Sequence, residues 1–451
     1  MASLRTLLLC LRDGHWRLLS PPANRSSFRA ALSSRADHNY ACASRPSLAL
    51  HAREWAASTP ACKRVLHDPL TGDFEGLLSR EVHLAFLSDS VGWQSLAALR
   101  AAVAINPQLK GIRFVRPSRG LSFRMNPWNL ALIPSNASGV KALFDGMGWE
   151  EGGGEGGRGG VRVVVANSGL WYNLRPRCDC HRCSVPLPPY ACCEPEVRAR
   201  HTSDLPTSPD ACGVRVAGHS IRHASVPPNH AQPALTHPSE LWRAYHQKPP
   251  AIPQWGWYAT ARRMRGTNTI REYAADVDTF AAQAEIWARE GRVPSAVLWH
   301  ETMPQHFERG ENACGEGLPS SPDPAAHQVE ELLALCGAER WGKGERQREA
   351  CQANWQNEVA SPLVERRGIS VVPMAALGSR GDLHVGAGCN KTVDARDSLL
   401  CDCSHWCDGS EASLYIATAI LNVVAAQVAA LHLKDTSHVK QHEKMEKSTA
   451  S

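Results

Sequence analysis

The stretch Leu84-Ala85-Phe86-Leu87-Ser88-Asp89-Ser90 decides the fold, because an apolar run passes directly into an Asp-Ser turn. A short apolar run that ends at a turn is typical of a fully buried strand. Val161–Ala166 is a second such run, rich in β-branched residues, and it predicts a central buried strand. Two further strands are predicted at Val297–Trp299 and Ile369–Val372, the second closed by a proline.

Helical spacing of apolar residues appears between these runs. It predicts helices over residues 93–103, 268–289, 328–338 and 346–366. Strands that alternate with helices along the chain favour an α/β fold with a mainly parallel sheet.

Composition divides the 451 residues into one large domain and its flanks. Residues 1–60 are rich in Ser, Ala, Arg and Pro without periodicity, and they predict a poorly ordered leader. The domain spans 61–433, and it carries a Gly-rich low-complexity loop at 150–160 and a Cys/His/Pro-rich insertion at 174–250. The polar tail at 434–451 is expected to fray.

The overall composition excludes some classes of protein. An apolar share of 43% with 21% charged residues argues against wholesale disorder. The net charge is only +5 and the basic residues are scattered, which argues against nucleic-acid binding. Sixteen cysteines, and glycosylation sequons at Asn24, Asn136 and Asn390, favour the secretory pathway, in the Golgi lumen or outside the cell. The apolar run Leu7–Leu11 is too short for a signal sequence and argues the other way.

The segment Ser413–Leu433 is uncharged and 21 residues long, enough to span a bilayer of about 30 Å. It also contains Asn422, Gln427 and His432, polar residues that favour a helix packed on the sheet. Membrane association therefore stays open at this point.

Three residue types in the order Ser…Asp…His supply the parts of a serine acyl-transfer site. Ser90 ends a predicted strand, at the sheet edge where open α/β sheets bind their ligands. Asp402 and His405 lie three residues apart, so the carboxylate can orient the imidazole that takes the serine proton. Taken singly, Asp89-Ser90 is also a common turn or helix N-cap, and Asp402 with His405 fits an N-cap beside a surface histidine.

An oxyanion donor is also available. Asn167 follows the strand Val161–Ala166, with Gly169 two residues later, and its amide can donate to a developing oxyanion. An ordinary loop asparagine explains the same residue equally well.

Together these motifs resemble the PC-esterase family, the trichome-birefringence-like branch of the SGNH (GDSL) superfamily. Leu87-Ser88-Asp89-Ser90-Val91-Gly92-Trp93-Gln94-Ser95-Leu96 resembles the Gly-Asp-Ser block of that family, and Asn167-Ser168-Gly169-Leu170-Trp171 follows a second strand as expected. Trp299-His300-Glu301-Thr302-Met303-Pro304-Gln305-His306-Phe307 is similar to its His-Phe block, and Asp402-Cys403-Ser404-His405-Trp406-Cys407 to its C-terminal motif. The resemblance covers about residues 60–173 and 265–430.

The resemblance implies an SGNH-like three-layer α/β sandwich that moves acyl groups, usually acetyl, on the hydroxyls of a polysaccharide or glycan. Ser90 would be the nucleophile, His405 the base and Asp402 its orienter, while Asn167 and the backbone N–H of Ser90 would form the oxyanion hole. No bound cofactor is expected; acetyl-CoA or another acetylated donor would be the co-substrate. The candidate substrate contacts are four aromatic residues: Trp93, Trp171, His306 and Trp406.

The resemblance also implies disulfides around the C-terminal motif. Cys403 would pair with Cys314, and Cys407 with an upstream cysteine, for which Cys62 is the candidate. Separately, the cysteines within 178–212 can bind zinc in principle, but their spacing fits no standard finger and favours either disulfides or a segment that folds poorly. No metal site is therefore expected.

Some residues depart from the family pattern. Ser88 stands where the family usually has glycine, and Cys407-Asp408-Gly409-Ser410-Glu411 lacks the Leu-Pro-Gly and Pro-Asp of plant members. An O-acetyltransferase is the first hypothesis. An O-acetylesterase of the same fold, a catalytically silent carbohydrate-binding or structural protein and a metal-binding Cys-rich protein are its alternatives.

Overall fold

The computed structural model describes residues 4–18, 26–33, 53–74, 81–115, 128–129, 133, 136–147, 149, 160–169, 215–216, 219–220, 270–291, 293–306, 329–337, 344–385 and 404–449. Its centre is a parallel sheet in the strand order β10-β9-β6-β3-β4, with the short strand β5 paired to the end of β3. The strands are β3 (Val82–Ser88), β4 (Ile112–Phe114), β5 (Trp128–Asn129), β6 (Val161–Ala166), β9 (Ser295–His300) and β10 (Ser370–Val372).

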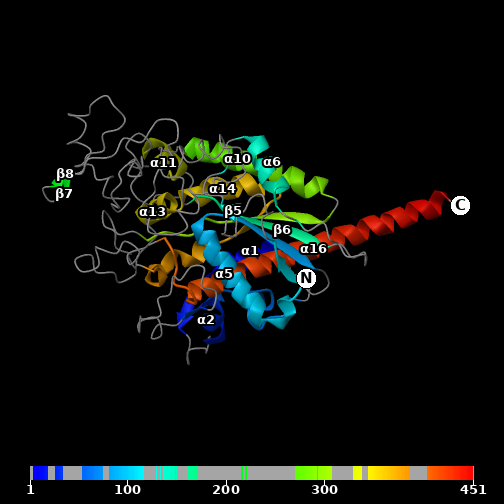
Figure 1. The fold of residues 1–451 in the computed structure, drawn as a ribbon, viewed down its shortest axis with the longest axis horizontal. Helices are drawn as coiled ribbons and strands as arrows, with labels where there is room; N and C mark the ends of the chain where they lie inside the picture. Colours follow the sequence, from blue (N-terminus) through cyan, green and yellow to red (C-terminus); the bar gives the residue numbers. More distant parts are fainter. Residues whose placement is uncertain are drawn as a thin grey trace.

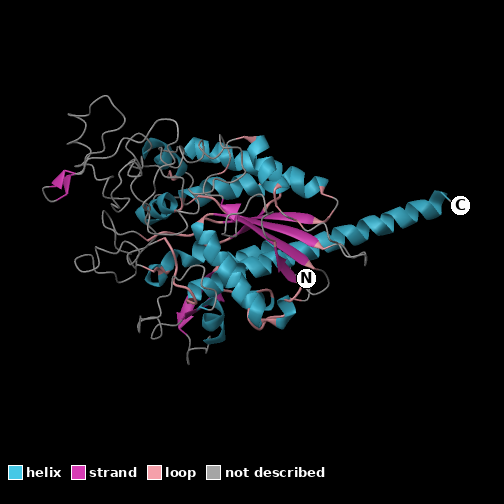
Figure 2. Cartoon of the chain, in the orientation of Figure 1, coloured by secondary structure: helices cyan, strands magenta, loops and turns pink. Residues whose placement is uncertain are grey.

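Helices cover both faces of the sheet (Figures 1 and 2). One face packs against α1 (Leu4–Arg12), α2 (Ser26–Ser33), α5 (Ser90–Ile105) and α16 (Glu411–Thr449). The other packs against α6 (Ala137–Asp145), α10 (Ile270–Glu290), α11 (Val329–Leu335), α13 (Glu345–Ala353) and α14 (Trp355–Glu365). Alternate strand residues supply the two cores: Leu84 and Phe86 face the first, while Ala85 and Leu87 face the second.

This arrangement confirms the α/β fold with a mainly parallel sheet. The predicted strands and helices form within a few residues of their expected bounds. One predicted helix, at 346–366, is divided at Asn354, which is the C-cap residue of α13 and binds the carbonyl oxygen of Ala350 through its side chain. Helical spacing alone does not show such a break, because both halves keep their apolar stripe.

The strand order creates a natural ligand position. Numbered along the chain, the five main strands lie in the order 2-1-3-4-5, so the chain direction across the sheet reverses between β3 and β6. In open α/β sheets, ligands generally bind outside the carboxyl ends of the strands at such a reversal point. The residues that follow β3 and β6 are Asp89 and Asn167.

A poorly ordered leader was expected at residues 1–60, but the residues described there form helices and strands. Leu7 and Leu11 of α1 lie in the core beside α16, and Phe28 and Leu32 of α2 join them. The strands β1 (Gly14–Leu18) and β2 (Arg53–Ala57) pair antiparallel. The contacts of α1 with α16 join segments about 400 residues apart along the chain, so periodicity within a nine-residue helix cannot reveal them.

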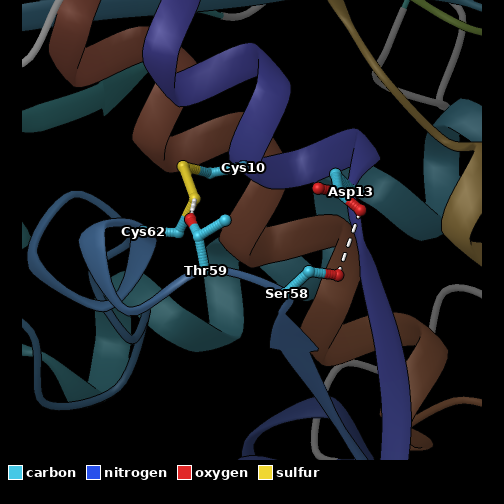
Figure 3. The surroundings of a disulfide bond; sticks show 5 residues. All are labelled: Cys10, Asp13, Ser58, Thr59 and Cys62. Carbon is cyan, nitrogen blue, oxygen red and sulfur yellow. Dashed lines mark hydrogen bonds between the residues drawn. A yellow bond between two sulfur atoms is a disulfide. The ribbon is translucent and has the colours of Figure 1, made fainter.

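Cys10 at the end of α1 forms a disulfide with Cys62 in the 3₁₀ helix η1 (Pro60–Arg64). Figure 3 shows this bond and, beside it, the hydroxyl of Ser58 donating to the carboxylate of Asp13 at 3.0 Å. The suggested partner of Cys407 was therefore wrong, since Cys62 is already bonded.

Two further cysteine pairings concern the C-terminal half. Cys336 and Cys351 are joined across α11 and α13. Cys407 is disulfide-bonded too. Cys314 and Cys403 also lie outside them, so their expected bond stays a prediction.

The helix α16 begins at Glu411 and runs through the expected polar tail to Thr449; Figure 1 shows its last part projecting from the rest of the described chain. Among the described residues, Glu411–Leu433 is the one helix long and apolar enough to cross a membrane. Ala419, Ile420 and Leu421 of this segment are fully buried in the core formed with α1, α5 and the sheet. The length and apolar composition of Glu411–Leu433 are therefore explained by a core helix as well as by a membrane span.

The remaining described elements are short. They are η2 (Pro107–Leu109), η6 (Ala375–Ser379), η7 (Gly381–Leu383) and the antiparallel pair β7 (Arg215–Val216) and β8 (His219–Ser220). The low-complexity loop at 151–159 and the 174–250 insertion, apart from β7 and β8, lie outside the described residues.

Candidate active site

The turn after β3 begins the site. Asp89 is the N-cap of α5, and its Oδ1 accepts the backbone N–H groups of Val91 (3.1 Å) and Gly92 (3.4 Å). The side chain is buried, so this cap fixes the direction in which α5 leaves the strand. Ser90 is the first residue of α5, at the positive end of the helix dipole.

Ser88, where the family pattern has glycine, packs against Gly92 in the first turn of α5. A Cβ atom on Gly92 would lie 2.0 Å from Oγ of Ser88, so no side chain fits at position 92 while serine occupies position 88. This departure from the pattern is therefore accommodated by the neighbouring glycine.

Asn167 joins the ends of three strands. Its N–H donates to the carbonyl of Leu87 at the end of β3, and its side-chain Nδ2 donates to the carbonyl of His300 at the end of β9 (both 2.8 Å). The residue is 3% exposed. An amide nitrogen carries two hydrogens, so one N–H of Asn167 holds the sheet edge together while the second is the one an oxyanion would use.

Gln94 connects α5 to the segment that carries His405. Its Nε2 donates to the carbonyl of Trp406 (2.6 Å), and the N–H of Trp406 donates to its Oε1 (2.9 Å). Both bonds are buried, and they join residues 312 positions apart. Ser90 lies one helical turn before Gln94 on the same face, and His405 directly precedes Trp406. The structure thus joins the helix that begins at Ser90 to the turn that contains His405.

Two more contacts hold the His405 turn. The carbonyl of His405 accepts the N–H of Val385 (3.0 Å), and Nε2 of Gln305, after β9, donates to Oγ of Ser404 (2.8 Å). His405 is itself half-buried. The turn is therefore fixed from α5, from the chain after β9 and from the segment after η7.

The predicted substrate contacts fare differently. Trp406 is fully buried with one ring face stacked on His384 at 4.0 Å, so it offers no exposed face to a sugar. His306 is also buried, and its two ring nitrogens bind His384 and the carbonyl of Gly378. Both assignments were wrong, because a motif position does not show which way a side chain faces.

Asp402, Trp171 and the side chains of Ser90 and Trp93 lie outside the described residues. Their predicted roles stay predictions.

Sequence reasoning missed two buried ionisable residues at the end of β9. Burial lowers the pKa of His300 to about 4, so its imidazole is neutral at physiological pH, 3.4 Å from Oγ of Ser95 on α5. Burial also raises the pKa of Glu301, although its carboxylate accepts the N–H of Met374 and lies 3.6 Å from Arg12. Both stand in the His-Phe block, at the end of a strand that is buried along its whole length.

Metal binding finds no support in the part of the chain that the structure describes, where no three His, Cys, Asp or Glu side chains are placed to hold an ion. The cysteines of 178–212 lie outside that part. No family model, curated protein or solved structure matches this chain.

Replacing Asn167 with alanine is expected to lower turnover by a factor on the order of 10²–10³, the usual loss for one preorganised oxyanion donor. It also removes the bond to the carbonyl of His300, so the free energy of unfolding should fall by about 1 kcal/mol. Steady-state rates and urea denaturation measure the two effects.

Asn106→Ala is the matched control. Asn106 is also a buried asparagine whose Nδ2 donates to a backbone carbonyl, that of Gly72 (3.1 Å), but it caps the far end of α5. It should lose stability and keep full turnover. Equal turnover in both variants would remove Asn167 from the site.

Replacing Gln94 with alanine is expected to destabilise the fold by about 3 kcal/mol, because it leaves the buried N–H and carbonyl of Trp406 without their partner. Turnover measured well below the unfolding temperature should fall about 10²-fold, since small displacements of a catalytic base are costly. The control is Gln108→Ala in η2, which follows the other end of α5. It removes one hydrogen bond, from the N–H of Phe74 to Oε1 of Gln108, and should leave turnover unchanged. Wild-type turnover in Gln94→Ala would show that the His405 turn does not depend on α5.

Proposed function

We propose that this protein is a serine-dependent carbohydrate O-acyltransferase of the PC-esterase type, which transfers acetyl groups through an acyl-serine intermediate. The observation that carries the proposal is the pair of hydrogen bonds between Gln94 and Trp406. They bring the helix that begins at Ser90 against the turn of His405, at the carboxyl edge of a parallel sheet. An SGNH-like sandwich is the finer fold assignment that goes with this proposal.

In the proposed reaction, His405 removes the proton of Ser90 as the serine oxygen attacks the carbonyl carbon of the acetyl donor, and Asp402 orients the imidazole. The N–H of Ser90 and the amide of Asn167 stabilise the oxyanion, which also lies at the N-terminus of α5. Collapse expels the leaving group of the donor, protonated by His405, and leaves acetyl-Ser90. A sugar hydroxyl then gives its proton to His405 and attacks the acetyl carbon. Collapse breaks the bond to the Ser90 oxygen, which takes the proton back from His405, and leaves the acetyl group on the sugar.

The same acyl-serine yields an esterase if water replaces the sugar hydroxyl. Exclusion of water by aromatic side chains favours transfer. Because Trp406 is buried in the core, we assign this role to Trp93 and Trp171. The disulfides Cys10–Cys62 and Cys336–Cys351 support a place in the secretory pathway, where such bonds persist.

A fluorophosphonate tests for the nucleophile. The full chain is treated with the reagent, digested and analysed by mass spectrometry, and we expect a single adduct on Ser90. The alternative of a catalytically silent protein predicts no adduct, and an adduct on another serine would relocate the site.

An acceptor experiment separates transfer from hydrolysis. An acetylated donor is supplied with and without a polysaccharide acceptor, and acetate and acetylated acceptor are both measured. Transfer predicts acetylated acceptor and slow acetate release without it. Fast acetate release with no acetylated acceptor would identify an esterase.

A further inference from the structure

Two buried histidines form a connected pair directly behind the His405 turn. Nε2 of His306 lies 2.9 Å from the carbonyl oxygen of Gly378, and Nδ1 of His306 lies 2.7 Å from Nε2 of His384. On the other side, Nδ1 of His384 lies 3.1 Å from the carbonyl oxygen of His405. All four imidazole nitrogens of the pair therefore take part in hydrogen bonds.

Counting hydrogens decides the charge of this pair. A carbonyl oxygen can only accept, so each outer bond requires an N–H, on His306 and on His384 respectively. The bond between the two imidazoles requires one more hydrogen. Two neutral imidazoles carry only two N–H groups, and the three bonds need three. The pair therefore holds one extra proton and one positive charge.

The stacking of the His384 ring on Trp406 favours placing that charge on His384. Burial lowers the pKa of His306, and this outweighs the opposing influence of the Gly378 carbonyl and of Asp382. His306 is then the neutral acceptor, with its hydrogen on Nε2. The ring of His384 is stacked on Trp406 with centroids 4.0 Å apart and planes at 29°, an arrangement that favours a cation.

Asp382 is the charged residue that acts on His306, and it opposes the effect of burial. Arg380 binds Asp382 through two nitrogens (2.8 and 2.9 Å) and lies 3.9 Å from Glu411. On η7, the His405 turn and the start of α16, the charged and titratable residues that the structure describes are Arg380, Asp382, His405, Asp408 and Glu411.

We propose that His384 is a buried imidazolium that shares one proton with His306 and positions the backbone of His405. The charged ring donates to the His405 carbonyl, which also accepts the N–H of Val385. Both histidines are positioning residues, because they act on the base through its backbone. The catalytic consequence rests on the proposed function, whereas the shared proton does not.

The pair gives stability a characteristic dependence on pH. The folded pair keeps one proton over a wide range, while in the unfolded chain both histidines titrate near pH 6.5. Above that pH the folded state binds one proton more, so stability falls as the pH rises. Below it the unfolded state binds one proton more, so stability falls as the pH drops. The contribution is therefore greatest near pH 6.5, with a tenfold change in the unfolding constant per pH unit on each side.

The test compares urea unfolding of the wild-type protein with that of a His306→Gln/His384→Gln variant between pH 5 and 9. The difference in unfolding constant should be largest near pH 6.5 and shrink on both sides. His15→Gln, at an exposed position, is the matched control and should show no two-sided profile. A difference that stays constant above pH 6.5 means that the pair is neutral, and it overturns the proposal.

A measurement on the unmodified chain is independent of whether the variant folds. The full chain is labelled with ¹⁵N-histidine, and its spectrum at pH 8 should retain an imidazolium with both ring nitrogens protonated. Absence of that signal overturns the proposal. Neither readout uses activity, so an imidazolium signal without acyl-serine formation would reject the proposed function and keep the histidine pair.

Discussion

Ser90→Ala and His405→Ala are each expected to lower turnover by at least about 10⁴-fold, and the double variant should be no worse than either single one. The nucleophile and the base act as one unit. Once either residue is replaced, replacing the other therefore causes no further loss of turnover. The residual rate comes from the oxyanion donors and substrate binding. Acetyl-donor consumption, measured with saturating donor, tests both statements.

The controls for this experiment are Ser58→Ala and His15→Ala. Ser58 is an exposed serine whose hydroxyl donates to the carboxylate of Asp13, and His15 is exposed on β1. Both variants should keep wild-type turnover. Losses that multiply in the Ser90→Ala/His405→Ala variant would mean that the two residues act independently, which a serine–histidine mechanism does not allow.

Removal of the Cys10–Cys62 disulfide by paired alanine substitutions is expected to lower the free energy of unfolding by about 4 kcal/mol. The bond closes a chain separation of 52 residues, and in the chain-entropy account a longer loop gives greater stabilisation. The bond also anchors α1, whose Arg12 lies 3.6 Å from the buried Glu301 after β9. Urea denaturation measures the loss.

The Cys336→Ala/Cys351→Ala variant provides the comparison, because its bond spans only 15 residues and should contribute about 3 kcal/mol. Peptide mapping without reduction should recover Cys10 and Cys62 in one linked fragment. Wild-type stability in the Cys10→Ala/Cys62→Ala variant, or free thiols at both positions in the wild-type protein, would contradict the prediction.

The sheet was largely predictable from sequence because its strands are buried on both faces. Val161–Ala166 is apolar at nearly every position, and a parallel sheet between two helical layers requires that pattern. The helix α10 was equally visible, since Tyr273, Val277 and Phe280 fall on one stripe and all lie in the core. Both signals are local, and a local window records them completely.

The first 60 residues were misjudged for the opposite reason. Leu4, Leu7, Leu8 and Leu11 have helical spacing over only nine residues, and the burial of Leu7 and Leu11 depends on α16 at the other end of the chain. Trp16 likewise finds its hydrogen-bond acceptor in the carbonyl of Ala376 (2.8 Å), 360 residues away. A short segment that completes a distant core carries little information about that core in its own sequence.

For the site, the sequence by itself determined which chemical groups are available and the strand ends at which two of them stand. Asp89, Ser90 and Asn167 follow β3 and β6 as predicted, because the carboxyl ends of parallel strands meet at one edge. Only the tertiary structure decided that Gln94 holds the His405 turn, that Trp406 faces His384 and away from any sugar, and that two histidines lie in hydrogen-bond contact. These outcomes depend on the direction of each side chain, which is set by packing between segments far apart in sequence and not by the residues beside it.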